Sequence, residues 1–380
     1  MIKILRAILL AYYSIITKVS REYSSVRFTI CQEGWYLLMR MKKNILALSF
    51  KEIEQFVCEI GFKKYRAQQI ISWLYEKQVR SINEMTDLSL SDRERLSEHD
   101  VLSPLKIVTR QKSEDGTEKF LLEMEDGNKI ESVAIPEEKR LTLCISTQAG
   151  CTLDCTFCLT ALEKLKRNLK SYEILDQVLT VQREMPERRI SNIVLMGMGE
   201  PLANLPAVTE AILWMTHAKG LGISPRKVTV STAGMVPQIK AFLEGPTHVN
   251  LSVSLNATTD AIRDQIMPKI NKLYPIKTLL TALRQTPLPS RRRVTFEYIL
   301  LSGVNDSLED ARRLLSLSRG IQCKINLIAF NEFPQSSYRR PSDDHILKFK
   351  KILMDGGMIA TLRKSRGRDI SAACGQLNGE

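Results

Sequence analysis

Residues 142–158 read TLCISTQAGCTLDCTFC, and this stretch decides the fold. The apolar-rich residues 141–147 predict a β-strand, and the chain then runs into three cysteines spaced CxxxCxxC, at Cys151, Cys155 and Cys158. Three thiolates on one short loop can bind three corners of an iron–sulfur cube. Because the motif holds no fourth cysteine, one iron stays open. The motif therefore predicts a 4Fe-4S cluster with a vacant coordination position.

A zinc site is the competing interpretation of the same cysteines. Zinc sites are usually four-coordinate and favour CxxC pairs, and no His or Cys lies close downstream of Cys158 to complete such a set. An open iron can instead chelate the amino and carboxylate groups of S-adenosylmethionine. One electron then splits the sulfonium bond and gives a 5'-deoxyadenosyl radical, so the cofactor performs the difficult chemistry.

From residue 140 onward, strand, loop and helix patterns alternate. Helices are expected at, for example, Tyr172–Arg183 and Ala207–His217. The predicted strands cover 141–147, 192–196, 227–232, 250–255, 294–300 and 324–329, with an extra one at 358–363. Six parallel strands with crossover helices predict an α/β fold, a partial (βα)6 TIM-like barrel, although a doubly wound sheet fits the periodicity equally well. In both architectures the chemistry gathers at the carboxyl ends of the strands.

Residues 41–105 predict a small helical accessory domain. Ser49 and Glu52 form a capping-box pattern, and apolar residues then recur at helical spacing until Gly61. Two further amphipathic helices are expected at Ala67–Lys77 and Ser91–Glu98.

Residues 106–140 lead into the core through a β-hairpin. Its strands are Lys119–Met124 and Lys129–Ala134, on either side of a turn that contains Asp126 and Gly127. The core itself is expected to cover 141–380, with a C-terminal loop that carries Cys374.

Residues 1–40 are of doubtful origin. The apolar run Ile4–Ile16 is interrupted by Arg6 and is shorter than the roughly 20 residues that cross a bilayer. A signal peptide fits the basic start, but no small-x-small cleavage site follows, and export would place an oxygen-sensitive cluster in an oxidising compartment. We therefore expect the natural start to be Met41.

The composition points to a globular protein with a polyanionic partner. Lys and Arg number 55 and Asp and Glu 42, so the formal charge is +13 and the pI about 9.3. This excess of positive charge favours nucleic acid as the partner, and an anionic membrane is the second choice. The eight cysteines do not follow the dense pattern of a secreted disulfide scaffold, which indicates reduced thiols in the cytoplasm.

Taken together, the motifs resemble the RlmN family of radical adenine C2-methyltransferases, over a region from about residue 45 to the C-terminus. The matching stretches are TLCISTQAGCTLDCTFC at 142–158, MGMGEPLANL at 196–205, VSTAG at 230–234, SLNA at 254–257, INLIAFNEF at 325–333 and RGRDISAACGQL at 366–377. The resemblance implies a radical S-adenosylmethionine barrel that binds a 4Fe-4S cluster.

The resemblance also implies roles for two cysteines and a carboxylate outside the motif. Cys374 matches the cysteine that takes a methyl group from one S-adenosylmethionine, while a second molecule per turnover supplies the radical. Cys144 matches the partner that resolves the resulting protein–RNA crosslink as a disulfide. Glu131 matches a proton acceptor, and its plainer interpretation is a solvated carboxylate on an edge strand.

Seven residues match the family's contacts to S-adenosylmethionine. Each has a plainer interpretation as a turn or a strand-end cap. They are Gly199, Glu200, Ser231, Ser254, Leu255, Asn256 and Asn331.

Without the family, a lone cysteine on a strand is usually a small buried apolar residue. For Cys144 and Cys374 this interpretation is the alternative to the roles that the resemblance implies. For Cys323, Cys31 and Cys58 it is the preferred interpretation.

RNA is the expected partner. By resemblance, the substrates are adenine 2503 of 23S rRNA and adenine 37 of some tRNAs, and the electron donor is a flavodoxin or ferredoxin. We expect a cytoplasmic monomer without a membrane partner. The basic stretches Lys164–Lys170, Arg291–Arg293 and Arg363–Arg366 are candidate phosphate contacts, or else solvated faces. The loop that carries Cys374 must receive a methyl group and then reach RNA, so we expect it to move.

Three other functions share parts of this pattern. The sister C8-methyltransferase type has the same cysteines, but Pro201 after GMGE and the tail RKSRGRDI favour the C2 enzyme. A glycyl-radical activase or another radical enzyme needs the cluster but not the pair Cys144 and Cys374. A non-enzymatic iron–sulfur RNA-binding protein would produce no 5'-deoxyadenosine.

Overall fold

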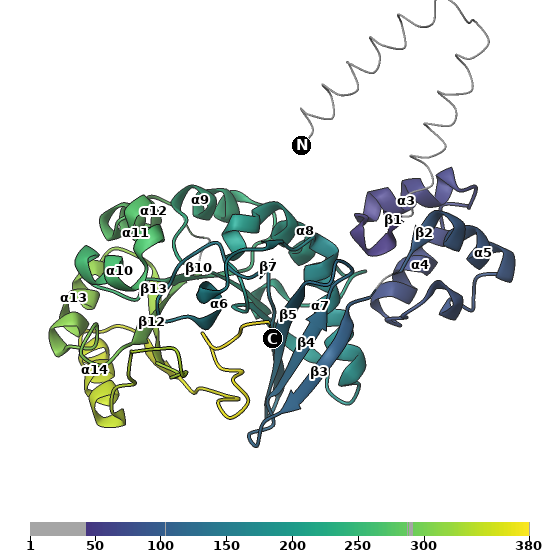
Figure 1. The fold of residues 1–380 in the computed structure, drawn as a ribbon. Helices are drawn as coiled ribbons and strands as arrows, with labels where there is room; N and C mark the ends of the chain where they lie inside the picture. The colour runs from purple at the N-terminus through teal and green to yellow at the C-terminus, as the bar shows by residue number, and fades with distance from the viewer. Residues whose placement is uncertain (1–42, 103, 287, 289–291, 380) are drawn as a thin grey trace, which may run out of the picture. The chain divides into compact units, whose positions relative to one another are not determined.

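The computed structural model describes residues 43–102, 104–286, 288 and 292–379 (Figure 1). The predictions for residues 1–40, Cys31 and Arg291 lie outside these residues. The chain forms two compact units, of which the first runs to Arg66 and resumes at Ser81–Leu102, and the second comprises Ala67–Arg80 and Ser103–Glu380. Within the described ranges, no helix is long and apolar enough to cross a membrane.

All three helices predicted near the N-terminus are present. They are α3 (Phe50–Glu59), α4 (Arg66–Tyr75) and α5 (Leu90–His99). The capping box is confirmed, since the backbone N–H of Ser49 donates to Glu52 Oε2 at 2.8 Å and that of Glu52 donates to Ser49 Oγ at 3.4 Å. The prediction for Cys58 is wrong, because this thiol lies on the exposed side of α3, next to the buried Val57.

The second unit is built on a single mixed sheet. In the described residues this sheet has ten strands in the order β14-β13-β12-β11-β10-β9-β6-β5-β4-β3. The parallel part comprises β6 (Arg140–Cys144), β9 (Ile190–Leu195), β10 (Val228–Thr232), β11 (Asn250–Ser254), β12 (Val294–Leu300), β13 (Cys323–Ala329) and β14 (Ala360–Arg363). All six strands predicted for this part are present, and the extra strand at 358–363 is confirmed as β14.

The strand order decides between the two architectures that the sequence left open. From β6 to β14 each new strand pairs beside the previous one, and the order never reverses. A doubly wound sheet needs such a reversal, whereas right-handed crossovers that always advance in one direction place every helix on the same face and curve the sheet into a barrel. The partial α/β barrel is therefore the correct fold, with its helices on the outer side (Figure 1).

The outer helices match the predicted crossovers. Within this layer α7 packs against α8, α9 against α12, and α13 against α14. Their bounds are α7 (Ser171–Glu184), α8 (Leu205–Thr216), α9 (Val236–Glu244), α10 (Asp260–Ile266), α11 (Pro268–Leu273), α12 (Ile276–Gln285), α13 (Leu308–Ser318) and α14 (Asp343–Asp355).

An antiparallel extension continues the sheet beyond β6. It consists of the predicted hairpin β4 (Glu118–Glu123) and β5 (Lys129–Glu137), together with an edge strand, β3 (Lys106–Lys112), which the sequence analysis missed. Strand β3, with the sequence KIVTRQK, is mostly exposed and ends in four polar residues, so it lacks the apolar signal of a buried strand. Since β5 pairs with β6, with Val133 opposite Cys144, the extension is part of the core sheet.

One buried glutamine joins the extension, the barrel and the helical layer. Gln177 of α7 accepts hydrogen bonds from the backbone N–H of Ser146 at 2.8 Å and from Ser132 Oγ at 2.9 Å. Its amide donates to the carbonyl oxygens of Ser146 at 2.9 Å and Glu173 at 3.2 Å. The side chain therefore replaces ladder bonds at the point where the chain leaves β6 for the cysteine loop.

We expect Gln177→Leu to lower the free energy of unfolding by ~2–4 kcal/mol, because the backbone groups of Ser146 would stay buried without partners. Urea denaturation measures this value. The matched control is Gln265→Leu on the exposed side of α10, for which we expect a change below about 0.5 kcal/mol. Equal stabilities for the two variants would contradict the role of Gln177.

Candidate active site at the carboxyl ends of the parallel strands

The three motif cysteines lie on the loop that follows β6. Gly150 turns this loop with a φ of +74°, and a Cβ at this position would collide with the backbone carbonyl of Lys164. Cys151 forms an isolated β-bridge with Lys164 and donates its N–H to the carbonyl of Glu163 at 3.3 Å. The loop thus crosses the segment 163–164 at a distance that only glycine allows.

Side chains from other loops fix the course of the cysteine loop. Gln148 Oε1 accepts the N–H of Thr152 at 3.2 Å and that of Glu200 at 2.9 Å. Lys269, at the start of α11, donates from Nζ to the carbonyl of Thr152 at 2.5 Å and from its N–H to Asp154 Oδ1 at 3.1 Å. These contacts fix the backbone of the cysteine loop at Thr152 and Asp154.

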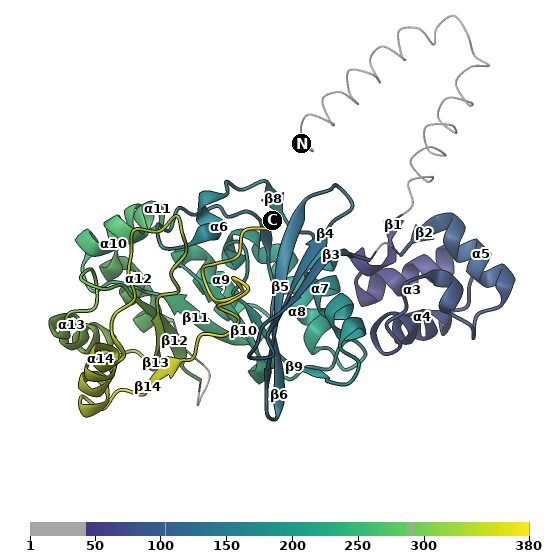
Figure 2. The same cartoon turned by 60° about the horizontal axis from the view of Figure 1, so that its bottom comes forward.

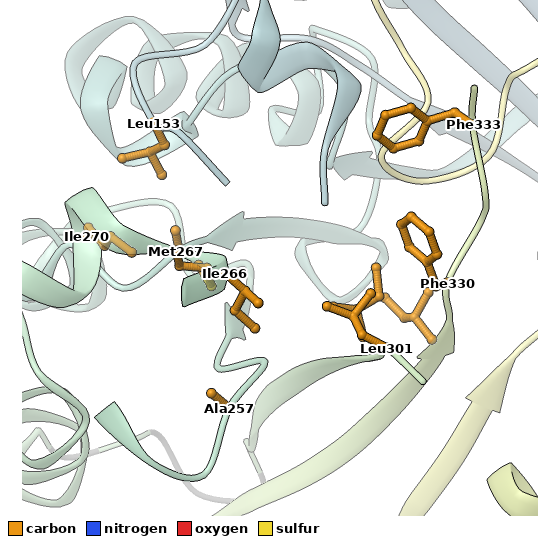
Figure 3. Packing of buried hydrophobic residues seen from close by; sticks show 11 residues of the cluster. Leu153, Ala257, Ile266, Met267, Ile270, Leu301, Phe330 and Phe333 are labelled. Atoms are coloured by element: carbon orange, nitrogen blue, oxygen red, sulfur yellow. The ribbon is translucent and has the colours of Figure 1, made fainter. Parts of the chain in front are cut away.

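An apolar cluster forms the floor of the cysteine loop (Figure 3). Cys151, Cys155 and Phe157 pack against it. The cluster comprises Leu153, Ala233, Ala257, Ile266, Met267, Ile270, Ile299, Leu301, Ile328, Phe330 and Phe333. Such a floor excludes water from one side of the thiols.

Burial of the thiols changes their acidity. It raises the pKa of Cys151 to about 12, and that of Cys155 well above its usual range. Negative charge on the neighbouring thiols adds to both shifts. Metal binding must therefore displace protons from three mutually repelling groups.

The arrangement suits a cluster better than a single metal ion. Across the residues that the structure describes, no three His, Cys, Asp or Glu side chains converge as a single-ion site requires. An iron–sulfur cube needs no such convergence, because each thiolate binds a different iron. The residues that would hold the cluster are Cys151, Cys155 and Cys158.

The predicted contacts for S-adenosylmethionine all lie at the carboxyl ends of parallel strands. Gly199 and Glu200 follow β9, Ser231 lies near the end of β10, Ser254–Asn256 end or follow β11, and Asn331 follows β13. The structure therefore places them on the same edge of the sheet as the cysteine loop.

Glu200 is a buried carboxylate with two backbone partners. Its Oε1 accepts the N–H of Leu202 at 3.0 Å, and its Oε2 that of Ala233 at 2.8 Å. Burial raises the pKa of this carboxyl group, although the two N–H donors oppose the shift. Gly199 precedes it with a φ of +96°, and a Cβ there would lie 2.5 Å from Gln148 Cβ. A carboxylate held in this way can still accept from a ligand ammonium group.

The two asparagines differ in how many of their side-chain polar atoms have a hydrogen-bond partner. Asn256, with a φ of +57°, accepts the N–H of Ile299 at 2.9 Å and directs its amide to Met267 Sδ at 3.4 Å. Asn331 donates to the carbonyl of Cys374 at 3.1 Å, but its Oδ1 is buried without a hydrogen-bond donor. This orphaned acceptor fits a donor group of a bound ligand. Leu255 is fully buried, its N–H donates to the carbonyl of Glu297 at 3.1 Å, and its carbonyl accepts from Arg263 at 3.2 Å, so such a contact would share a backbone group that already has a partner.

A cavity of about 670 Å³ follows the inner face of the barrel and contains both Cys144 and Cys374. Its walls are formed by alternate residues of the parallel strands. These include Thr142, Asn192, Val194, Thr229, Ser252, Thr295, Glu297, Lys324, Asn326, Ile328, Thr361 and Arg363. Toward the amino ends of the strands the walls carry Arg140, Arg226 and Lys227, so the cavity is basic at the end remote from the cysteine loop.

One guanidinium group faces both cysteines of the cavity. Burial raises the pKa of Cys144 to about 12 and also raises that of Cys374, and in both cases the charge of Arg363 opposes the shift. Arg363 Nη1 lies 3.4 Å from Met196 Sδ, and the backbone N–H of Met196 donates to the Cys144 thiol. The cation is therefore placed to stabilise either thiolate.

Glu131 is not the solvated edge-strand carboxylate that was the plainer interpretation. It is fully buried on β5, which lies between β4 and β6, and its Oε1 is 2.9 Å from Lys119 Nζ. In the basic stretch 164–170, Arg167 is committed to ion pairs with Glu173 at 2.7 Å and with Asp126 at 2.5 Å. This arginine therefore stabilises the fold and is not free for phosphate. Cys323 is buried, as predicted.

The sequence analysis missed several side chains that shape the site. Gln148 and Lys269 hold the cysteine loop, and the buried Arg263 binds the carbonyl oxygens of Ala233 at 2.7 Å and Leu255 at 3.2 Å. No local pattern distinguishes Gln148 or Lys119. None distinguishes Arg263 either, because Asp264 and Gln265 beside it on α10 are also polar.

Two family models match the chain. Residues 43–102 match the ribosomal RNA large subunit methyltransferase N-terminal domain, and residues 145–315 match the radical SAM superfamily. The dual-specificity RNA methyltransferase RlmN of Geobacter sulfurreducens is 52% identical over 337 residues, which cover 89% of this chain and 92% of that protein. The protein of the same name from Geotalea uraniireducens is 49% identical, over 89% of this chain and 97% of its own length.

The chain belongs to the RlmN family.

A solved relative agrees with this assignment. The crystal structure of a radical SAM methyltransferase from Sphaerobacter thermophilus is 40% identical to this RlmN-family chain, with a TM-score of 0.86 over 89% of this chain and 100% of that one. Membership of the radical SAM superfamily implies a 4Fe-4S cluster and S-adenosylmethionine as cofactors.

We expect the alkylation rate of Cys144 to rise about tenfold per pH unit between about pH 8 and pH 11, because only the thiolate reacts and the pKa is about 12. Arg363→Met should slow the reaction at every pH, since it removes the cation that favours the thiolate. Iodoacetamide labelling followed by mass spectrometry of the Cys144 peptide measures the rate. Arg363→Lys, which keeps a charge, is the control, and identical rates for Arg363→Met and the parent protein would refute this role.

Proposed function

We propose that this protein methylates C2 of adenine in RNA, with Cys374 as the methyl carrier and Cys144 as the resolving thiol. The observation that carries the proposal is the cavity that contains both thiols and the cation Arg363, and in whose walls basic residues outnumber acidic ones. Relatives at about half identity over nine-tenths of the chain, all named dual-specificity RNA methyltransferase RlmN, support it.

Each thiol has a defined task in this proposal. When bound, the cluster and S-adenosylmethionine supply the radical chemistry, with a second S-adenosylmethionine per turnover as the methyl source. Cys374 Sγ accepts the methyl group and presents it to adenine C2. Cys144 Sγ takes the C2 proton. Its thiolate then attacks Cys374 Sγ, the bond from Cys374 Sγ to the methylene carbon breaks with its electron pair going to that carbon, and the carbon takes a proton to become the methyl group. A thiol reductant then reduces the Cys144–Cys374 disulfide for the next turnover.

The ligand contacts are assigned to the strand-end residues. Glu200 accepts from the ammonium group of S-adenosylmethionine, Gly199 allows the close approach of the backbone, and Asn331 Oδ1 gains its missing donor. Ser231, Ser254, Leu255 and Asn256 complete the contact set. The resemblance gives Glu131 the role of a proton acceptor, whereas its contacts with Lys119, Asn378 and Gly379 favour a positioning role.

The finer points of the proposal follow from the resemblance. Adenine 2503 of 23S rRNA and adenine 37 of tRNA are the proposed substrates, and a flavodoxin or ferredoxin is the proposed electron donor. We propose a cytoplasmic monomer. Residues 41–105 are proposed to form an accessory domain, residues 106–140 the connection to the core, and residues 141–380 the catalytic core.

Restoring this gene to a strain that lacks its own C2-methyltransferase should restore 2-methyladenosine in rRNA and tRNA. Cys374→Ser should abolish the product, since the methyl carrier is lost. Mass spectrometry of the nucleosides measures both results.

Cys323→Ser is the matched control, because Cys323 is a buried thiol on β13 that lines no wall of the cavity, and it should retain the product. Appearance of 8-methyladenosine instead would assign the C8 reaction. Full activity of Cys374→Ser would favour another class of radical enzyme, and no 5'-deoxyadenosine with reductant and S-adenosylmethionine would favour a non-enzymatic protein.

The basic end of the cavity should contribute to RNA binding. We expect Arg226→Gln/Lys227→Gln to reduce the slope of log K against log salt by about 0.7–0.9 for each phosphate contact that is lost. Fluorescence anisotropy with a tRNA anticodon arm measures the slope. The control Lys348→Gln/Lys351→Gln removes the same charge from the exposed side of α14 and should leave the slope unchanged. Equal slopes for both double variants would exclude this end of the cavity from the RNA site.

A further inference from the structure

The residues that carry Cys374, here termed the Cys374 segment (residues 364–379), run from β14 across the barrel toward β5 and α6 (Figure 2). The segment contains no helix or strand in the described residues. Its position therefore depends on individual hydrogen bonds to the elements that it crosses.

The cysteine loop holds the middle of the segment. The N–H of Leu159, next to Cys158, donates to the carbonyl of Gly375 at 2.7 Å, and Thr160 Oγ1 donates to that of Leu377 at 2.6 Å. These contacts place Cys374 beside the residues that would hold the cluster. They are made by α6 (Leu159–Leu162), which is a single short turn.

The antiparallel extension holds both ends of the segment. At the start, Asp115, in the turn between β3 and β4, accepts the N–H of Gly367 at 3.0 Å. In the same turn Ser113 Oγ donates to Asp369 at 2.6 Å. At the far end, Glu131 Oε2 accepts the N–H of Asn378 at 2.8 Å and that of Gly379 at 3.3 Å.

The far anchor is a buried charged pair. Both Glu131 and Lys119 are almost inaccessible, with side-chain exposures of 0% and 9%, and they lie diagonally across β4 and β5 on the same face. Lys119 Nζ lies 2.9 Å from Glu131 Oε1 and forms an ion pair with it, but the angles at this contact are not those of a hydrogen bond. A buried carboxylate is costly unless it is neutralised and saturated with donors. Here Lys119 supplies the charge, and the last residues of the Cys374 segment supply the donors.

We propose that the buried pair Lys119–Glu131 is the anchor that positions the Cys374 segment over the cavity, so that the antiparallel extension serves the methyl-carrying cysteine. This proposal rests on the proposed role of Cys374. Glu131 and Lys119 are positioning residues, and Glu131 acts through the backbone of Asn378 and Gly379.

The contacts of Glu131 favour this role over proton transfer. One of its oxygens faces Lys119 and the other accepts two backbone N–H groups. Moving a proton to this carboxylate would weaken both sets of contacts, because each depends on its negative charge. In addition, no surface of the side chain is exposed to the cavity or to solvent.

The test is hydrogen–deuterium exchange of the full-length, cluster-loaded protein, read on peptides that cover residues 368–377. In this segment the amides of Ala372, Ala373 and Gln376 are hydrogen-bonded. We expect Lys119→Met to accelerate their exchange by at least about tenfold, because the buried carboxylate loses its neutralising partner and its hold on the segment weakens. Exchange of β12 should be unchanged.

Lys106→Met is the matched control. It removes the same side chain from an ion pair with Glu123 in the same extension, but Lys106 is exposed and contacts no part of the Cys374 segment. In the Lys106→Met variant we expect residues 368–377 to exchange at the same rate as in the parent protein.

A second variant keeps the buried pair intact, so that correct folding is not in question. Deletion of residues 378–380 removes the two backbone donors of Glu131 and leaves both side chains of the pair in place, and we expect it to accelerate exchange at 368–377 as Lys119→Met does. Combining the two changes should add nothing further, since both remove the same contact. Parent-like exchange in the deletion variant would overturn the proposal.

Glu131→Gln separates the two roles of this carboxylate. As an anchor, it should accelerate exchange of the Cys374 segment and lower the fraction of Cys374 that carries a methyl group, as measured by peptide mass. Loss of RNA methylation with parent-like exchange would assign proton transfer and refute the anchor. Because exchange requires no RNA, the anchor can fail or hold independently of whether adenine C2 is the substrate.

Discussion

Three thiols that become negatively charged when they bind metal must be held within eight residues of one loop, against their mutual repulsion. Every layer around the loop serves this constraint. Gly150 lets the loop cross residues 163–164, Gln148 and Lys269 fix its backbone, and the apolar cluster beneath it keeps water away from one side of the thiols. The partial barrel provides the location, because the carboxyl ends of its parallel strands bring the cysteine loop and the ligand-binding residues to a single edge.

The two sides of this edge differ in polarity, and the difference separates two kinds of chemistry. Beneath the cysteines the barrel is apolar, whereas the cavity along its inner face is lined by amides, hydroxyl groups and cations. Radical chemistry gains from a dry environment, and a polyanion gains from cations. Cys144 and Cys374 line this cavity, where the charge of Arg363 opposes the rise in pKa that burial causes for both thiols.

Much of the barrel could be predicted because its strands are short buried apolar runs with polar residues directly after them. Strand β12 was predicted at its observed bounds, and the cysteine motif and strand-end residues were placed on the correct edge. Strand β3 was missed, since its exposed polar residues give no burial signal. The pair Lys119–Glu131 and the role of Gln148 depend on contacts between distant parts of the chain, which local patterns do not encode. Cys58 shows the opposite error, because an apolar residue type was assumed to be buried on a helix whose exposed side it occupies.

The separation along the chain between the Cys374 segment and its contacts has a consequence for maturation. Thr160 meets Leu377 across 217 residues, and Glu131 meets Asn378 across 247. Contacts of such long range form late, because the entropy of closing a large loop must be offset by structure that already exists. The Cys374 segment therefore docks after the barrel and its cysteine loop have formed, and until then the loop is uncovered on the side of α6 that the segment later contacts. Delivery of iron and sulfide to the newly made protein has its natural interval before the last residues dock, and docking then seals the loaded centre.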